Sequence, residues 1–200
     1  LEMDIPRIIR ESNPWWRTGL RGAPKDLPSF HRHFFPPLLK WVQNPRFSRG
    51  MILKGPRQVG KTTLLRQLIK PLGAGMNVCY VSFDQPSLQT RPFEWWLAPW
   101  LASRPARERK FLLIDEVTYG RQWDRWLKHY IQTRRDLVVA ATSSSASLLI
   151  RGTRESGVGR WDDIWIPPFS YAEILDWREG VHPLSRRHVV LIPPRQTDMR

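Results

Sequence analysis

The feature that most constrains this sequence is a glycine-rich loop set between an apolar segment and an amphipathic helix. Residues 55–62 read GPRQVGKT and satisfy the pattern GxxxxGK(S/T). Residues 51–53 are apolar and predict a short buried strand before the loop. Residues 61–70 predict a helix after it, because apolar side chains recur on one face before Pro71. Strand, loop and helix in this order are the context that a phosphate-binding P-loop requires.

The residue types of this loop suit phosphate chemistry. Glycines allow the backbone to wrap phosphates with its N–H groups, and the N-terminus of the following helix favours anions. Lys61 is then placed to reach the β and γ phosphates, and the Thr62 hydroxyl is placed to bind Mg²⁺. The residues expected to bind the nucleotide are Gly55, Pro56, Arg57, Gln58, Val59, Gly60, Lys61, Thr62 and Thr63.

The acidic end of a second apolar segment is also a candidate for function. Residues 111–116 read FLLIDE, which is typical of a Walker B strand that ends in a carboxylate. We expect Asp115 to bind Mg²⁺ together with Thr62. We expect Glu116 to polarise a water for attack on the γ phosphate, as a general base must. The alternative is that both acids merely begin a loop and cap the next helix.

Two further groups of residues are candidates for the same chemistry. Thr142 and Ser143 follow the apolar residues of the strand predicted at 137–142, and one of them would sense the attacking water. Arg160 precedes the strand predicted at 163–166, where many ring ATPases place an arginine finger for a neighbouring subunit. The hydroxyls could instead cap a helix, and Arg160 could instead lie in a solvated loop. The expected catalytic residues are Glu116, Lys61, Thr142, Ser143 and Arg160.

The pattern of the whole chain predicts three parts. Residues 1–48 are rich in proline, aromatic and basic residues and are interpreted as a helical lead-in that packs on the core. Residues 49–178 alternate strands with helices, which favours an α/β domain with a mostly parallel sheet, and residues 179–200 show no strong pattern. Predicted strands cover 51–53, 78–83, 111–115, 137–142 and 163–166. Predicted helices cover 4–12, 34–42, 61–70, 92–103, 121–132 and 170–178.

Two local signals refine the predicted helices. Pro99 is expected to kink or divide the helical region 92–103, because proline lacks the N–H group and crowds the preceding turn. Ser170 and Glu173 form a capping box, which predicts that the last helix begins between them.

Composition limits the class of protein and its surroundings. The 200 residues are 41% hydrophobic and 25% charged, which excludes collagen-like, coiled-coil and strongly disordered chains. Cys79 is the single cysteine, so an internal disulfide is excluded and a reducing, cytoplasmic location is expected. The longest apolar stretches are strand-sized, so neither a membrane-spanning helix nor a signal peptide is expected. His31 and His33 alone are an incomplete set of metal ligands.

The balance of charge favours a polyanionic partner. Lys and Arg number 32 against 18 Asp and Glu, which gives a net charge of +14. Such an excess suits DNA, RNA or nucleotides, although an Arg-rich genome composition would give the same number. Trp15 and Trp16, beside Arg17 and Arg21, are the best candidates for a surface that stacks on nucleic-acid bases. The tryptophans at helical spacing, expected in the core or at a subdomain interface, are Trp95, Trp96, Trp100, Trp123 and Trp126.

Four segments of the sequence resemble prokaryotic AAA-type ATPases of the archaeal ATPase kind. The segments read ILKGPRQVGKTTLLRQLI, FLLIDEV, ATSSSASLL and GRWDDIWIPPFSYAEIL, and the resemblance covers residues 8–177. It implies an additional-strand, catalytic-glutamate P-loop NTPase fold, in which a parallel five-stranded sheet of order 5-1-4-3-2 forms the middle of a three-layer sandwich. It also implies that ATP is the nucleotide and Mg²⁺ its metal ion.

The resemblance also implies roles for residues that match its motifs. Lys61 and Thr62 match the phosphate and metal residues, and Asp115 with its neighbour matches the Walker B pair. Thr142 with Ser143 matches the sensor position, although a glycine is common where Ser143 stands. Such proteins usually continue into a helical lid and a C-terminal domain. We expect both to be absent here, because the sequence ends soon after the last predicted helix.

The sequence therefore favours an ATPase that binds ATP and Mg²⁺ and drives a conformational change in a partner or in nucleic acid. The alternative is a nucleotide-dependent switch that hydrolyses ATP poorly and binds DNA or RNA through its Arg-rich N-terminal part. A kinase that phosphorylates a small molecule is a third hypothesis, which the adjacent acids Asp115 and Glu116 disfavour. A homo-oligomer is a further expectation, since Arg160 would act on a neighbouring subunit.

Overall fold

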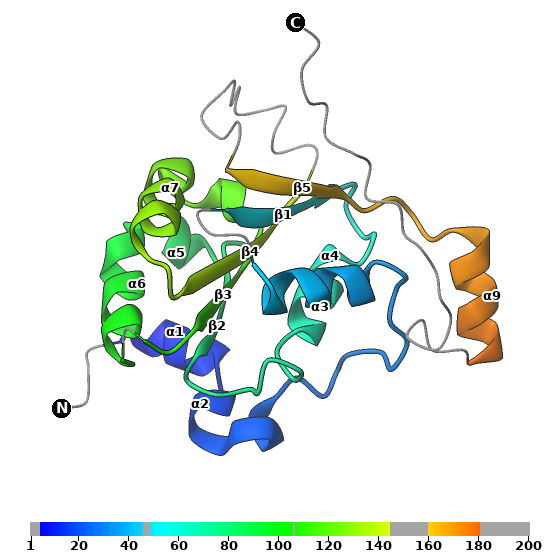
Figure 1. Cartoon of the computed structure of the whole chain (residues 1–200), viewed down its shortest axis with the longest axis horizontal. Helices are drawn as coiled ribbons and strands as arrows, with labels where there is room; N and C mark the ends of the chain where they lie inside the picture. Colours follow the sequence, from blue (N-terminus) through cyan, green and yellow to red (C-terminus); the bar gives the residue numbers. More distant parts are fainter. Residues whose placement is uncertain (1–4, 46–48, 106, 145–159, 181–200) are drawn as a thin grey trace, which may run out of the picture.

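A parallel five-stranded sheet forms the centre of the molecule (Figure 1). The computed structural model describes residues 5–45, 49–105, 107–144 and 160–180. The strand order is β2-β3-β4-β1-β5, and every pair of neighbouring strands is parallel. Read from the other edge, this is the order 5-1-4-3-2, so the predicted fold is confirmed. The strands are β1 (Gly50–Gly55), β2 (Val78–Ser82), β3 (Lys110–Asp115), β4 (Leu137–Ser144) and β5 (Trp161–Trp165).

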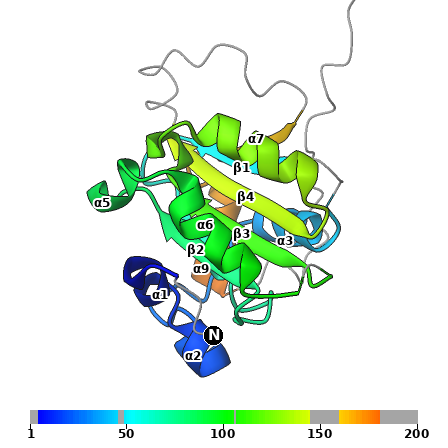
Figure 2. The ribbon, with the colours of Figure 1, turned by 90° about the vertical axis from the view of Figure 1, so that its left-hand side faces the viewer.

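Helices cover both faces of the sheet and complete the three layers. They are α1 (Arg7–Ser12), α2 (Trp15–Thr18), α3 (Phe35–Gln43), α4 (Lys61–Gln67), α5 (Pro86–Gln89), α6 (Phe93–Ala102), α7 (Trp123–Thr133) and α9 (Tyr171–Glu179), with 3₁₀ turns η1 (Gly19–Gly22) and η2 (Val117–Tyr119). Figure 2 looks onto the face that α6 and α7 cover, whereas α3 and α4 pack on the other face. Within the described ranges, none of these helices has the length and apolarity that crossing a bilayer demands.

Strand β3 shows why the sheet has two cores. Side chains alternate between the faces of a strand, so a strand buried on both sides is apolar almost throughout. Leu112 and Ile114 belong to the cluster that contains Trp96, whereas Leu113 belongs to the cluster that contains Leu64 of α4. The apolar run that predicted this strand therefore supplies both cores.

Helix α6 runs unbroken through Pro99, so this proline does not divide the segment. An internal proline costs roughly 3 kcal/mol because it removes a hydrogen bond and crowds the turn before it. Trp96 and Trp100 are both fully buried on the same helix. Fully burying a large apolar side chain contributes about 1.5–3 kcal/mol, so these two contacts offset the proline.

Side chains of the N-terminal lead-in form hydrogen bonds with the backbone of the edge strand β2. Asn13 is fully buried, and its side-chain oxygen accepts from the Tyr80 N–H at 2.6 Å while its Nδ2 donates to the Tyr80 carbonyl at 2.8 Å. The indole N–H groups of Trp15 and Trp16 both donate to the Val78 carbonyl oxygen, at 2.9 and 2.7 Å. These side chains take the place of a further strand along β2 and satisfy its exposed backbone groups.

Two expectations about tryptophans are wrong. Trp15 is only 3% exposed and Trp16 packs partly buried against the core, so neither is a free platform for nucleic-acid bases. Trp95 is 40% exposed and lies beneath the Arg91 guanidinium, so it is not a core residue, and its place at a subdomain interface stays a prediction. Helical spacing placed it with Trp96, but adjacent residues point a third of a turn apart and only one of them can face the sheet.

We expect Asn13→Ala to destabilise the fold by about 2 kcal/mol or more, because it leaves buried backbone groups of Tyr80 without partners. Urea unfolding followed by circular dichroism measures this. Asn44→Ala is the matched control, since Asn44 is exposed and its hydrogen bonds to described residues lie within its own turn. Its effect should stay within about 0.5 kcal/mol. Equal effects of the two variants would contradict a stabilising contact between Asn13 and the backbone of β2.

Candidate active site

The P-loop connects the end of β1 to the start of α4, and two glycines set its path. Gly60 has a φ of +87°, in the left-handed region that other side chains disfavour. A Cβ atom on Gly55 would lie 2.2 Å from the carbonyl oxygen of Ile166, closer than atoms can approach. The close approach to Ile166 therefore requires glycine at position 55, and the left-handed backbone favours glycine at position 60.

Lys61 is the first residue of α4, and its side chain folds back over the loop. Its Nζ donates to the carbonyl oxygen of Gly55 at 3.0 Å and to that of Pro56 at 2.6 Å. Burial lowers the pKa of this ammonium group, and the carboxylates of Glu116 and Asp115 oppose that shift. A partly desolvated cation at this place favours an anionic neighbour.

Asp115 ends β3 and accepts hydrogen bonds from two threonines. The Thr62 hydroxyl lies 2.9 and 3.1 Å from its two carboxylate oxygens, and the Thr142 hydroxyl lies 2.6 Å from one of them. Burial raises the pKa of this carboxyl above its ordinary value, and the hydrogen bonds from Thr142 and Thr62 act in the opposite direction. A hydroxyl and a carboxylate so placed are oxygen ligands of the kind that Mg²⁺ prefers.

Glu116 is held beside Asp115 by the tip of β4. Its backbone N–H donates to the Thr142 hydroxyl oxygen at 2.9 Å, and its Oε2 accepts from the Ser144 N–H at 3.1 Å. The backbone of Glu116 has a φ of +49°, a left-handed conformation that costs free energy for a residue with a side chain. The Thr142 hydroxyl thus links the two acids, by donating to one and accepting from the backbone of the other.

Ser143 does not share the position of Thr142. Successive side chains of a strand point to opposite faces of the sheet, so only one of two adjacent residues faces Asp115. Ser143 is fully buried, and its hydroxyl donates to the Ser144 carbonyl oxygen at 3.3 Å. Of the two residues predicted for the sensor position, the structure brings Thr142 to the acids.

Arg160 lies near the amino-terminal ends of the strands, whereas the P-loop follows the carboxyl end of β1. It directly precedes β5, whose first residue, Trp161, pairs with Gly50 at the start of β1. The length of β1, roughly 16 Å, separates that end from Gly55. The Arg160 guanidinium faces the side-chain amide of Gln132, whose oxygen accepts from it at 2.9 and 3.1 Å in the amide orientation that satisfies both groups. Arg160 therefore does not join the other predicted residues at the site of its own chain.

Two cavities adjoin the P-loop. The first, of about 400 Å³, is lined by the P-loop and by Asp84, Glu116 and Tyr119. The second, of about 410 Å³, is mainly apolar and is lined on the side away from the acids by Phe30 and by Trp177 of α9. Gln58, Gly60 and Thr63 line both cavities, so the two are adjacent.

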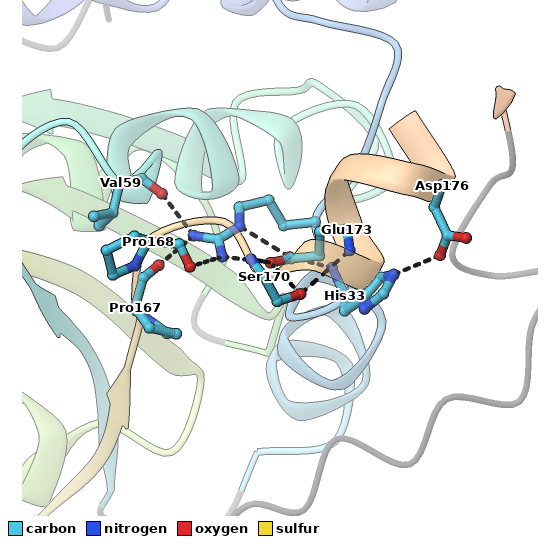
Figure 3. Close-up of polar contacts among 8 residues, drawn as sticks. His33, Val59, Pro167, Pro168, Ser170, Glu173 and Asp176 are labelled. Carbon is cyan, nitrogen blue, oxygen red and sulfur yellow. Dashed lines mark hydrogen bonds and ion pairs between the residues drawn. The ribbon is translucent and has the colours of Figure 1, made fainter. Parts of the chain in front are cut away.

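A buried arginine behind the P-loop was not predicted from the sequence. Arg32 is 4% exposed, and its Nη1 donates at 2.8 Å to both the Val59 and the Pro167 carbonyl oxygens. Its Nη2 and Nε donate to the two carboxylate oxygens of Glu173, at 2.7 and 3.0 Å (Figure 3). The lead-in, the P-loop and the start of α9 are therefore held together by one guanidinium.

Glu173 both caps helix α9 and accepts hydrogen bonds from Arg32. The predicted capping box is present, since the Ser170 hydroxyl accepts from the Glu173 N–H and the Glu173 carboxylate accepts from the Ser170 N–H. The same carboxylate accepts from the His33 N–H, while the His33 ring contacts Asp176 one turn further along α9 (Figure 3). Burial alone would raise the pKa of Glu173, but the hydrogen bonds from Arg32 and the backbone lower it below its ordinary value.

Comparison with known proteins identifies the family. A family model described as an AAA domain matches residues 48–175. The chain belongs to this family. Uncharacterized protein MJ1637 from Methanocaldococcus jannaschii is 30% identical over 119 residues, which are 54% of this chain and 24% of that protein. The structure of PCH-2 from C. elegans is 21% identical, with a TM-score of 0.46 over 76% of this chain and 49% of that one. The predicted resemblance to AAA-type proteins, with a nucleotide-binding P-loop, is thus confirmed.

The ion pair behind the P-loop of this AAA domain makes its stability depend on pH. We expect Glu173→Gln to destabilise the fold by about 3 kcal/mol near neutral pH, because it leaves the buried Arg32 charge without its counter-ion. The lowered pKa of Glu173 means that its contribution is complete above its ordinary value of 4.5 and is lost as the pH falls through the lowered pKa.

Urea unfolding of wild type and variant over a series of pH values measures this dependence. The difference between the two should narrow as the pH falls below 4.5. Glu179→Gln changes an exposed acid at the far end of the same helix and serves as the control. A difference that stays constant with pH would show that Glu173 stabilises the fold through its shape alone.

Proposed function

We propose that this AAA domain binds ATP with Mg²⁺ and hydrolyses it. The observation that carries the proposal is the contact of the P-loop hydroxyl of Thr62 with Asp115, and of Asp115 with Thr142, which also holds the backbone of Glu116. The candidate metal ligand Asp115, the candidate base Glu116 and the Thr142 hydroxyl that contacts both thus lie within one chain of hydrogen bonds. This chain of contacts borders the cavity in front of the P-loop.

The residues of the loop would hold the phosphates. The backbone N–H groups between Gly55 and Thr63 lie at the N-terminus of α4, where the helix dipole favours anions. The Lys61 ammonium, which lies on two carbonyl oxygens of the loop, would turn to the β and γ phosphates. Thr62 and Asp115 would hold Mg²⁺, which neutralises the negative charge of the phosphates when bound.

Glu116 would act as the general base. A base must lie within hydrogen-bond reach of the water that it activates, and the Glu116 side chain lines the phosphate cavity. The Ser144 N–H donates to Glu116 Oε2 at 3.1 Å and so orients the carboxylate. Thr142, at the tip of the neighbouring strand, would sense the attacking water. Ser143, on the other face of β4, would support this tip and not contact the water.

The apolar cavity would receive the adenine base. It adjoins the phosphate cavity through Gly60 and Thr63, so one nucleotide can extend across both. Phe30 and Trp177 present aromatic surface to it, and stacking on aromatic side chains contributes about 1–3 kcal/mol per base. The nucleotide would then contact the lead-in and α9 as well as the P-loop.

Hydrolysis would drive a conformational change in a partner, and Arg160 would complete the site of a neighbouring subunit in a homo-oligomer. Its distance from the P-loop of its own chain means that it could act only on the site of another subunit. DNA or RNA binding through the Arg-rich surface stays a separate prediction. It would appear as affinity that falls steeply with salt, as phosphate contacts require. Burial of Trp15 and Trp16 removes one of its supports.

We expect Lys61→Ala to abolish ATP binding and Glu116→Gln to retain binding but lose at least about 100-fold in turnover, since a general base contributes that much or more. Calorimetry measures binding, and phosphate release measures turnover. Glu108→Gln, which removes a partly buried acid paired with Arg104 before the start of β3, is the control. Unchanged turnover in Glu116→Gln would refute the base. Wild-type binding without turnover would favour the nucleotide-dependent switch.

The adenine cavity has its own test. We expect Trp177→Ala to weaken ATP binding about tenfold while tripolyphosphate, which has no base, binds as before. Tyr171→Ala is the matched control, because Tyr171 lies on the same helix and is 76% exposed. Equal losses for ATP and tripolyphosphate would show that Trp177 acts on the P-loop and not on the base.

A further inference from the structure

Arg32 contacts the P-loop at the one peptide group that links Val59 to Gly60. Its Nη1 donates to the Val59 carbonyl oxygen at 2.8 Å, from the side of the loop that faces α9. The described residues contain no cis peptide bond, so the Val59 C=O and the Gly60 N–H belong to a trans peptide and point in opposite directions. A donor that holds this carbonyl therefore also aims the next N–H.

The orientation of this peptide matters because Gly60 lines the phosphate cavity whereas Arg32 does not. Gly60 also has a φ of +87°, a conformation from which glycine rotates without the steric barrier that other residues meet. Without an external contact, such a peptide can turn over and present its carbonyl oxygen to an anion. An oxygen there would repel a phosphate that an N–H would bind.

We propose that Arg32 is a positioning residue for the phosphate site: it holds the Val59 carbonyl outward and so keeps the Gly60 N–H directed at the bound phosphates. This inference rests on the proposed binding of a nucleotide at the P-loop. Arg32 is itself fixed by the bidentate contact with Glu173 and by the Pro167 and Pro168 carbonyl oxygens. The orientation of one P-loop amide is thus coupled, through Arg32, to the segment before α9 and to the first turn of that helix.

The chemistry of this contact requires an arginine. The planar guanidinium donates in several fixed directions at once, here to a carboxylate and to carbonyl oxygens on two further segments. A lysine ammonium keeps the charge but is a single point on a flexible stem, so it satisfies Glu173 without reproducing the fork. Arg32→Lys therefore separates the charge of the residue from its geometry.

The test compares Arg32→Lys with Glu173→Gln, using tripolyphosphate and ATP as ligands in calorimetry. Both variants weaken the ion pair. Arg32→Lys also removes the Nη1 donor to Val59, whereas Glu173→Gln leaves that donor in place, still held by the Pro167 and Pro168 carbonyl oxygens. We expect Arg32→Lys to weaken both ligands about tenfold or more, and Glu173→Gln to weaken them less than about threefold. Arg21→Met, which removes an exposed guanidinium from the lead-in, should leave both affinities unchanged. A loss for ATP alone would assign Arg32 to the base cavity and overturn the proposal.

A measurement on the wild-type chain keeps the proposal falsifiable should Arg32→Lys fail to fold. In a ¹H–¹⁵N spectrum of protein labelled at glycine, tripolyphosphate should shift the Gly60 amide strongly downfield, because that N–H would donate to phosphate oxygen. A Gly60 amide that does not move on saturation would overturn the positioning role. If the amide moves but no ATP is hydrolysed, the proposed ATPase function fails while phosphate binding at Gly60, on which the role of Arg32 depends, stands.

Discussion

The parallel alignment of β1, β3 and β4 is the constraint on which the whole site depends. Leu53 pairs with Thr142 across one ladder, and Ile114 pairs with Ala141 across the next. This register brings the P-loop, Asp115 and Thr142 to the same edge of the sheet. A slip of one residue in β4 would turn Thr142 to the opposite face and separate the two acids from the hydroxyl that joins them.

Two buried carboxylates near the P-loop show opposite electrostatic balances. The pKa of Asp115 is raised, so its hydrogen bonds do not offset the cost of burying its charge. The pKa of Glu173 is lowered, because Arg32 and backbone donors more than offset its burial. Glu173 therefore stabilises the fold as it stands. The burial of Asp115 is not fully offset by its neighbours, and a bound cation would favour its charged form, as the metal site proposed there requires.

Local sequence predicted the parts of the site that are encoded within one segment. The P-loop requires glycines at fixed spacing, and β3 requires an apolar run that ends in a carboxylate, so both could be read without knowing the fold. The capping box at Ser170 was found for the same reason, since its two members lie one helical turn apart. The strand order followed from the resemblance to a known family, and the structure agrees with it.

Contacts between distant segments left no such signal. Arg32 and Glu173 are separated by 141 positions, and nothing near either residue indicates the other. Trp15 looked like a surface aromatic beside arginines, because only the fold shows that an edge strand needs its indole N–H. Arg160 was placed with the catalytic residues by its position before a strand. In a parallel sheet, however, the strands start at the end opposite to their carboxyl ends, where the site lies.

These distant contacts explain how the two ends of the described chain take part in one site. The lead-in and α9 lie at opposite ends of the described sequence, yet Phe30 and Trp177 line the same cavity, and Arg32 with Glu173 closes the space behind it. A displacement that broke this pair while either charge stayed buried would leave that charge without its counter-ion, which opposes relative movement of the two segments. A movement of α9 would then reach the P-loop through the Val59 carbonyl. The two cavities beside the P-loop are thus joined by a polar contact as well as by their shared lining.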